Sequence, residues 1–208
     1  MLRVKRFRMF GSYLRVGWLG RTEVRLHWAA LVLAAVLVVS KLVGLVIGLA
    51  TLVLMHELGH AYLARRAGLA VSHIEMHPFG GRCLYYADWA TPWDRAVIAW
   101  GGVLFQLPLL AIGFGIQALP RPDGWLGAQI ASVAVVWSLY NLVTIAVNLI
   151  PMPPLDGAVA WRLVPMIPAR LRAARERRET RAEPTGPSRR EVALKRAKAR
   201  GLRVLDDE

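Results

Sequence analysis

Two histidines and a glutamate within five residues form the segment of this chain best suited to chemistry. The segment reads His-Glu-Leu-Gly-His and occupies residues 56–60. Residues four apart lie on the same face of a helix, so the His56 and His60 imidazoles can bind one metal ion. Glu57 projects near that face, where its carboxylate can take a proton from a water molecule at the metal. The spacing therefore predicts a metal site with a general base beside it.

These three side chains lie inside an apolar run from Leu42 to about Ala64. The run has the length and composition of a membrane-spanning helix. An alternative is that the side chains only form hydrogen bonds at a helix end, but ionisable groups are costly inside a span and by default mark function. The pattern H-E-x-x-H is also the helix signature of zinc peptidases. Metal binding is therefore the favoured interpretation.

Composition predicts the helices that position this segment. The chain has 208 residues, of which 55% are hydrophobic. Its apolar runs fall at residues 26–40, 42–64, 96–119 and 125–150. Residues 69–94 have a hairpin pattern with a glycine turn, and residues 12–28 have a weaker strand pattern. We predict an all-α polytopic membrane protein with about four transmembrane helices, a small β-hairpin or sheet on the cytosolic side and a basic C-terminal tail.

The same patterns divide the chain into three regions. Residues 1–25 form a basic surface segment, residues 26–168 a membrane-embedded core, and residues 169–208 a basic cytosolic tail. The N-terminal apolar run has no small-residue cleavage site after it, so we expect no cleaved signal peptide. Cys83 is the only cysteine, which excludes an intrachain disulfide.

The net charge of +13 is distributed in a way that predicts topology. Twenty-five of the 27 lysines and arginines fall in residues 1–25, 65–95 and 162–208. The positive-inside rule then places both termini in the cytosol and the metal site towards the cytosolic side of an integral membrane protein, which we expect in a bacterial inner membrane. Fourteen basic residues from Arg162 onward predict contact with anionic lipid. That tail has no aromatic residues, so we expect no nucleic-acid partner.

A catalytic zinc needs a third protein ligand and one open position. His27, His73 and His77 are candidates by residue type. Asp156 is better placed, because the prolines that follow the last apolar run stop its helix and bring the carboxylate back to the depth of His56.

The wider string around Asp156 is more specific than the aspartate alone. Residues 148–157 read N-L-I-P-M-P-P-L-D-G, which closely resembles the N-x-x-P-x-x-x-L-D-G motif of the site-2 protease family. The chain also has H-E-L-G-H at residues 56–60 and P-F-G-G at residues 78–81. The three motifs occur in that family's order, and the resemblance covers roughly residues 22–160.

The resemblance implies an intramembrane zinc metalloprotease with one zinc ion per chain. By motif position, His56, His60 and Asp156 would bind the zinc, and Glu57 would be the general base. Asn148 would lie near the reacting carbonyl, where its amide could donate a hydrogen bond to the developing oxyanion. The alternative for Asn148 is an interhelical hydrogen bond, which we expect instead for Asn141.

The chain also departs from the family. Members commonly have A-G-P-x-x-N at the start of the third core span, whereas residues 101–106 here read G-G-V-L-F-Q. Val103 replaces the proline and Gln106 the asparagine, so we expect a shifted amide contact and altered local packing. The chain leaves no room for a PDZ or CBS domain, and we expect no regulation by such a domain within it.

Three functions follow as hypotheses. The leading one is hydrolysis of peptide bonds in or near the transmembrane segment of a membrane-protein substrate, as in regulated intramembrane proteolysis, which leaves room for a regulatory membrane partner. The second is a proteolytically silent protein that binds transmembrane segments. The third is a zinc-handling protein or transporter, for which Glu57 has no obvious use. The hairpin at Gly80 and Gly81 is either a plain turn or an edge strand that pairs with an extended substrate.

Overall fold

The computed structural model describes residues 9–10, 12–182, 192, 195–196 and 199. It divides into two compact units, residues 1–164 and 165–208, and every site residue predicted above lies in the first. The elements in chain order are β1 (Met9–Phe10), β2 (Tyr13–Leu19), β3 (Thr22–His27), α1 (Trp28–Val39), α2 (Val43–Arg66), β4 (Val71–His77), β5 (Gly80–Tyr85), α3 (Pro92–Ala118), α4 (Gly124–Val135), the π-helix η1 (Val136–Tyr140), α5 (Asn141–Asn148), α6 (Gly157–Ala160) and α7 (Leu163–Ala182).

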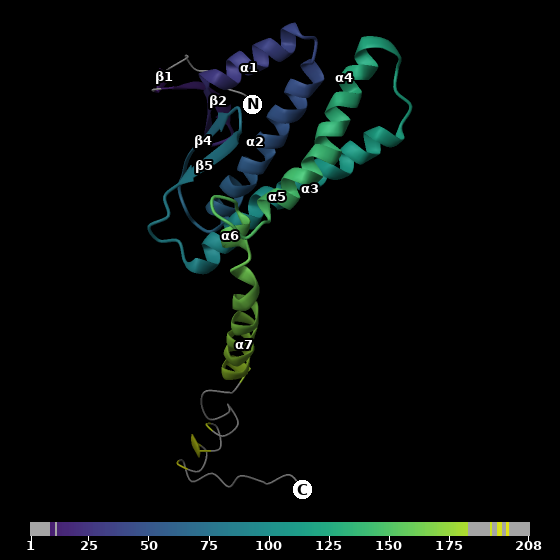
Figure 1. The fold of residues 1–208 in the computed structure, drawn as a ribbon. Coiled ribbons are helices and arrows are strands. Elements are labelled where there is room, and N and C mark those ends of the chain that lie inside the picture. Colours follow the sequence, from purple (N-terminus) through teal and green to yellow (C-terminus); the bar gives the residue numbers. More distant parts are fainter. Residues whose placement is uncertain (1–8, 11, 183–191, 193–194, 197–198, 200–208) are drawn as a thin grey trace. The chain divides into compact units, whose positions relative to one another are not determined.

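The strands form one mixed sheet in the order β1-β2-β3-β4-β5. Strands β3 and β4 are parallel and the other neighbours are antiparallel. The β2–β3 turn contains Gly20 at φ +60°, a conformation that glycine adopts without strain. The sheet lies beside α2, which contacts β4 and β5 (Figure 1). The expected cytosolic-side hairpin is thus part of a five-stranded sheet.

Alternation along the strands gives this sheet two different faces. Val24, Ile74 and Cys83 are register partners on one face, and Ile74 is fully buried. The other face has a buried polar network. In it the Arg25 guanidinium and the Glu75 carboxylate both contact His73, at 3.1 and 3.0 Å.

Helices α2 and α3 cross at a pair of glycines. A Cβ atom on Gly59 would clash with the Gly101 carbonyl oxygen, and one on Gly101 would lie 2.5 Å from the Gly59 carbonyl oxygen. Only glycine permits this backbone approach. Because Gly59 belongs to the H-E-L-G-H segment, the crossing brings α3 directly against the predicted metal ligands.

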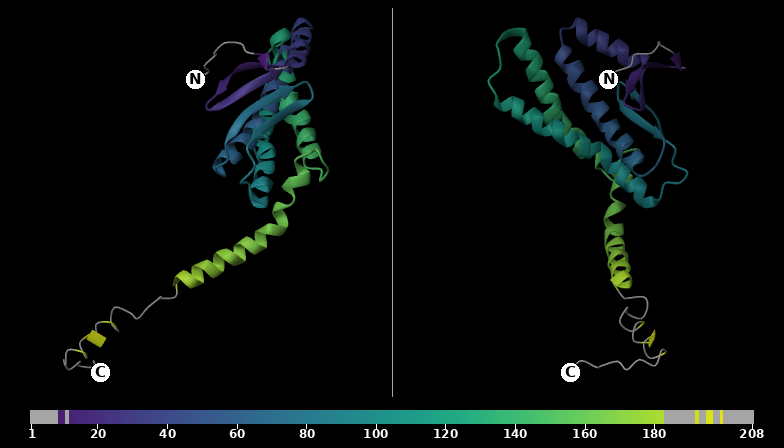
Figure 2. Two further views of the ribbon diagram at one scale, coloured as in Figure 1. Left: turned by 90° about the vertical axis from the view of Figure 1, so that its left-hand side faces the viewer. Right: turned by 180° about the vertical axis from the view of Figure 1, so that it is seen from behind.

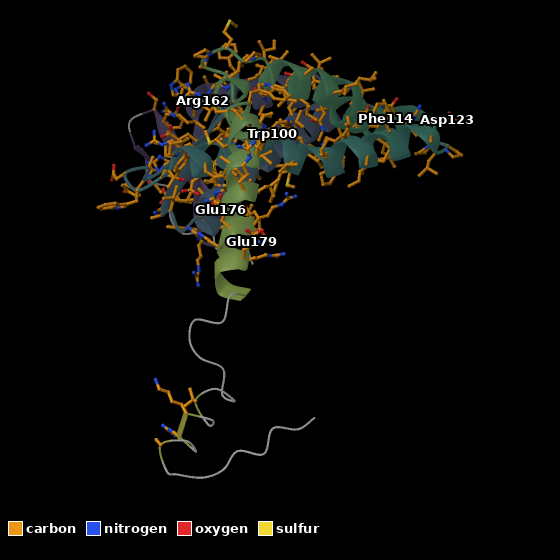
Figure 3. All side chains as sticks on the ribbon, turned by 90° about the horizontal axis from the view of Figure 1, so that it is seen from below. Trp100, Phe114, Asp123, Arg162, Glu176 and Glu179 are labelled. Carbon is orange, nitrogen blue, oxygen red and sulfur yellow. The ribbon has the colours of Figure 1, made fainter. Side chains whose placement is uncertain are left out.

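The start of helix α3 is fixed by its sequence. Thr91 and Asp94 form a capping box at its start, and Pro92 occupies the first turn. Its axis runs from Trp100 past Phe114 towards the loop that carries Asp123 (Figure 3). Helix α4, η1 and α5 then return along α3 as one continuous apolar segment (Figure 2).

Among the described residues, three of the four expected spans are helices long enough to cross a membrane. Strand β3 takes the chain as far as His27, and α1 has only 12 residues, or about 18 Å. A helix needs roughly 20 residues to cross a bilayer, so the expected first span is too short to cross by itself. In the part of the chain that the structure describes, three helices are long and apolar enough to cross: Val43–Arg66, Pro92–Ala118 and Gly124–Asn148.

Candidate metal centre

Helix α2 places the two histidines one turn apart with their rings close together. The ring centroids are 4.7 Å apart at an interplanar angle of 85°. Asp156, just before α6, completes a triangle. Its Oδ2 lies 3.0 Å from His56 Nε2 and 3.2 Å from His60 Nε2, and the two Nε2 atoms are 3.1 Å apart. Among the described residues these three side chains form the group that could hold a metal ion.

The size of this triangle fits zinc. Zinc binds imidazole nitrogen and carboxylate oxygen at about 2.0–2.2 Å, which separates two ligand atoms of a regular tetrahedron by roughly 3.3 Å. The three observed separations of 3.0–3.2 Å are within a few tenths of an ångström of that value. The three side chains could therefore hold a zinc ion, which would then have room for a water molecule or a substrate.

The hydrogen bonds on the far side of each ring point to the same conclusion. His60 Nδ1 lies 2.8 Å from the Ile98 carbonyl oxygen, which can only accept, so the proton of a neutral His60 is on Nδ1. His56 Nδ1 lies 3.2 Å from Gln106 Oε1. Both Nε2 lone pairs then face the Asp156 carboxylate. Three acceptors this close repel one another unless a cation lies between them, and a metal ion would be such a cation.

Two tryptophans close the loop that carries Asp156. The Trp161 Nε1–H donates to the Leu149 carbonyl oxygen at 2.6 Å, and the Trp100 Nε1–H donates to the Ala160 carbonyl oxygen at 3.0 Å. Their rings meet edge to face with centroids 5.4 Å apart. These bonds tie both ends of the loop to each other and to α3, so Asp156 is held at the height of the histidines.

Glu57 is buried beside this group, with 4% of its surface exposed. Its carboxylate lies against β5, because a Cβ atom on Gly81 would be 2.7 Å from Glu57 Oε1. Strand β5 is an outer strand of the sheet order. The glycine of the P-F-G-G motif therefore leaves the space that the Glu57 side chain fills.

The other predicted candidates lie elsewhere. His27 caps α1 by accepting from the Ala29 amide, His77 accepts from the Phe79 amide in the β4–β5 turn, and His73 belongs to the polar network of the sheet. Of the four candidates for the third ligand, Asp156 is the one grouped with His56 and His60.

The two asparagines of the last apolar run have different environments. Asn141 is fully buried and donates to the Gln106 and Trp137 carbonyl oxygens, as expected for interhelical packing. Asn148 is the last residue of α5 and is half-buried. Its predicted place near a reacting carbonyl stays a prediction.

The sequence did not predict in full how Gln106, Trp100 and Trp161 contribute to the site. The contact of Gln106 with His56 was foreseen only as a shifted amide contact, and nothing in the pattern indicated that Trp100 and Trp161 hold the Asp156 loop. The spacing of residues 98, 102 and 106, which share one face of α3, was the available signal.

Fold and site together point to an integral membrane protein with a group of two histidines and one carboxylate that could hold a metal ion. Comparison with known proteins agrees. The profile of Peptidase family M50 matches residues 44–122. "Putative zinc metalloprotease YwhC" of Bacillus subtilis is 30% identical over 159 residues, covering 62% of this chain and 71% of that protein. This chain belongs to peptidase family M50.

Two further relatives show how far the similarity extends. "Putative zinc metalloprotease Rip3" of Mycobacterium tuberculosis is 38% identical over 124 residues, which cover 57% of this chain but only 31% of that protein. The chain thus spans about a third of the length of that relative. The structure of the site-2 protease from Methanocaldococcus jannaschii superposes with a TM-score of 0.57 at 22% identity, covering 73% of this chain and 71% of that one, and shows the same fold.

Proposed function

We propose that this chain is a zinc-dependent intramembrane peptidase that hydrolyses peptide bonds in or near the transmembrane segments of membrane proteins. The single observation that carries the proposal is the triangle of His56, His60 and Asp156 with a buried Glu57 beside it. The similarity to proteins named as putative zinc metalloproteases, Rip3 and YwhC, supports zinc as the metal.

In this mechanism His56, His60 and Asp156 hold the metal, which supplies Lewis acidity that polarises a carbonyl and acidifies water. The Glu57 carboxylate accepts a proton from the attacking water and later delivers it to the leaving amine. The Asn148 amide donates a hydrogen bond to the oxygen of the carbonyl under attack. Burial of Glu57 strengthens its electrostatic interactions, because little water remains to screen them.

The position of β5 supports a mode of substrate binding. An outer strand can pair with an extended peptide through backbone hydrogen bonds. Because Glu57 contacts β5 at Gly81, a peptide added at this edge would run close to the general base. A transmembrane helix must unwind before cleavage, and such pairing would hold it unwound.

The surroundings are part of the same proposal. We infer a location in a bacterial inner membrane, with both ends of the chain cytosolic, from the distribution of basic residues. The basic side chains of α7, such as Arg172 and Arg175, support contact with anionic lipid headgroups. A regulatory membrane partner is compatible with this arrangement.

The test is a cleavage time course in detergent or liposomes with a purified single-span substrate. Glutamine keeps the size of Glu57 but cannot accept the proton, so we expect Glu57→Gln to fold, retain zinc and lose about 10²–10⁴ in rate. The matched control is Glu75→Gln, which removes another buried carboxylate without touching the metal group. Cleavage by Glu57→Gln at the wild-type rate would refute the mechanism. A wild type that binds both zinc and substrate without cutting would favour a silent binding protein.

A further inference from the structure

Three residues on one face of α3 surround the two histidines. Ile98, Gly102 and Gln106 are spaced by four and so occupy successive turns of that face. Ile98 holds His60 through its backbone carbonyl oxygen, which no substitution removes. His56 is held differently, by the side chain of Gln106. The two ligands therefore depend on their neighbours to different degrees.

The His56 ring is packed as well as hydrogen-bonded. A Cβ atom on Gly102 would lie 2.6 Å from His56 Nδ1, so the ring rests on the α3 backbone at this glycine. One turn further along, Gln106 is 2% exposed and its Oε1 faces the same Nδ1 at 3.2 Å. The backbone sets the position of the ring, and the amide determines how it is rotated and which nitrogen carries the proton.

A chain of hydrogen bonds from α5 orients that amide. The Thr144 hydroxyl donates its one proton to the Asn141 carbonyl oxygen at 2.8 Å. The Thr144 oxygen can then only accept from Gln106, whose Nε2 lies 3.5 Å away at the far end of hydrogen-bonding range. The donor end of the amide is directed to Thr144, and its acceptor end is left for His56.

The side chain of Asn141 holds the backbone of Gln106. Its amide donates to the Gln106 carbonyl oxygen at 3.0 Å, and Asn141 is fully buried. The π-turn η1 ends immediately before Asn141. An extra residue in a turn rotates the following residues by about 100°, so η1 sets which side chains of α5 face Gln106.

We propose that Gln106 is a positioning residue for the metal site, fixed by Thr144, that holds His56 with Nδ1 protonated and Nε2 free to bind the metal. The inference rests on the proposed zinc function. Partners of this kind orient metal-bound histidines, and their loss typically costs 10–100-fold in metal affinity.

Gln117 offers a matched control on the same helix. Its Nε2 donates to the Ser138 hydroxyl and to the Ala134 carbonyl oxygen, so it also links α3 to the returning segment. It lies three turns from Gln106 and does not contact the metal group. Methionine matches glutamine in length and removes the amide at either position.

The experiment measures zinc affinity by chelator competition, together with the visible spectrum of the cobalt-substituted protein, for the wild type, Gln106→Met, Gln117→Met and Thr144→Val. We expect a 10–100-fold loss of affinity and an altered spectrum in Gln106→Met, a smaller loss in Thr144→Val, and less than a threefold change with an unaltered spectrum in Gln117→Met.

Equal affinities and spectra for Gln106→Met and Gln117→Met, whether unchanged or both reduced, would reduce Gln106 to a packing role and overturn the inference. If Gln106→Met does not fold, Thr144→Val provides the test. A zinc affinity and a cobalt spectrum equal to those of the wild type in Thr144→Val would then overturn the inference. A wild type that binds no zinc would overturn the proposed function and this inference with it. If the wild type binds zinc and Gln106→Met binds it equally well, the inference about Gln106 is overturned but the proposed function is not.

Discussion

Asp156 differs from the two histidines in how it reaches the metal site. Its loop is closed by the Trp161–Leu149 hydrogen bond and by the contact of Trp161 with Trp100, whereas the histidines are adjacent turns of one helix. Removing any of the three ligands leaves two, which is too few for the usual three protein ligands of a catalytic zinc.

We therefore predict one zinc ion per wild-type chain and loss of most of it in His56→Ala, His60→Ala and Asp156→Ala. Metal analysis after dialysis against a weak chelator measures this. Asp123→Ala is the control, since this exposed aspartate forms no side-chain capping bond. Undiminished zinc in Asp156→Ala would remove Asp156 from the site.

The buried polar face of the sheet makes a separate prediction about pH. Burial disfavours ionised Glu75, but hydrogen bonds from Arg82 at 2.7 Å and from His73 outweigh it and lower its pKa. A lowered pKa contributes stability above the ordinary value of about 4.3, and that contribution is lost as pH falls through the lower folded value.

We expect Glu75→Gln to unfold more easily than the wild type at pH 7, by about 1.5–3 kcal/mol for hydrogen bonds to a charged group. The difference should shrink as pH falls below about 4. Unfolding in detergent across this pH range measures it, with exposed Glu179→Gln as the control. A pH-independent difference would contradict the role of the Glu75 charge.

Among the elements, the contact between α2 and α3 determines the site most directly. At the Gly59–Gly101 crossing the clashing atoms are backbone, which cannot rotate away as a side chain can. The same crossing brings the Ile98 carbonyl oxygen to His60, so separation of the helices would disturb both stability and metal binding.

We predict that Gly59→Ala destabilises the protein by at least about 1–3 kcal/mol, the usual cost of overpacking, and weakens zinc binding. Gly115→Ala on α3 is the control, since an added Cβ there meets nothing within 4 Å and alanine favours a helix by up to about 1 kcal/mol. Thermal unfolding of both variants in detergent measures their stabilities. Equal stability would show that the helices can adjust at Gly59.

For the whole molecule, the distribution of charge and the length of α1 lead to different expectations about the side of the membrane on which the N-terminal segment lies. Seven basic residues in residues 1–25 favour a cytosolic N-terminal segment, yet α1 is too short to cross alone. A cytosolic N-terminus would therefore need residues outside α1 to complete the crossing.

We predict that reporters fused to either end of the chain report the cytosolic side. The control is a reporter inserted in the turn before α4, beside Arg121, which should report the opposite side. An N-terminal reporter on that opposite side would show that the chain crosses the membrane three times and that α1 does not contribute to a crossing.

The amino-acid sequence by itself determined the local features of this protein. The spacing of His56 and His60 places them on one face of any helix. Counting the residues of the apolar runs is enough to predict membrane spans. The N-x-x-P-x-x-x-L-D-G string identifies Asp156 by its neighbours in the sequence. Each of these signals lies within a few turns of chain, where periodicity and side-chain chemistry act directly.

Only the tertiary structure decided which distant residues meet. The partner of His56 is 50 residues away at Gln106, that of His60 is 38 residues away at Ile98, and Trp100 reaches across 60 residues to the loop of Asp156. The start of α1 is likewise a tertiary outcome, because β3 pairs with β4 as far as Leu26 and takes the first two residues of the apolar run at 26–40. Such contacts depend on how closely helices and strands approach, which glycines such as Gly59 permit but which no local pattern specifies.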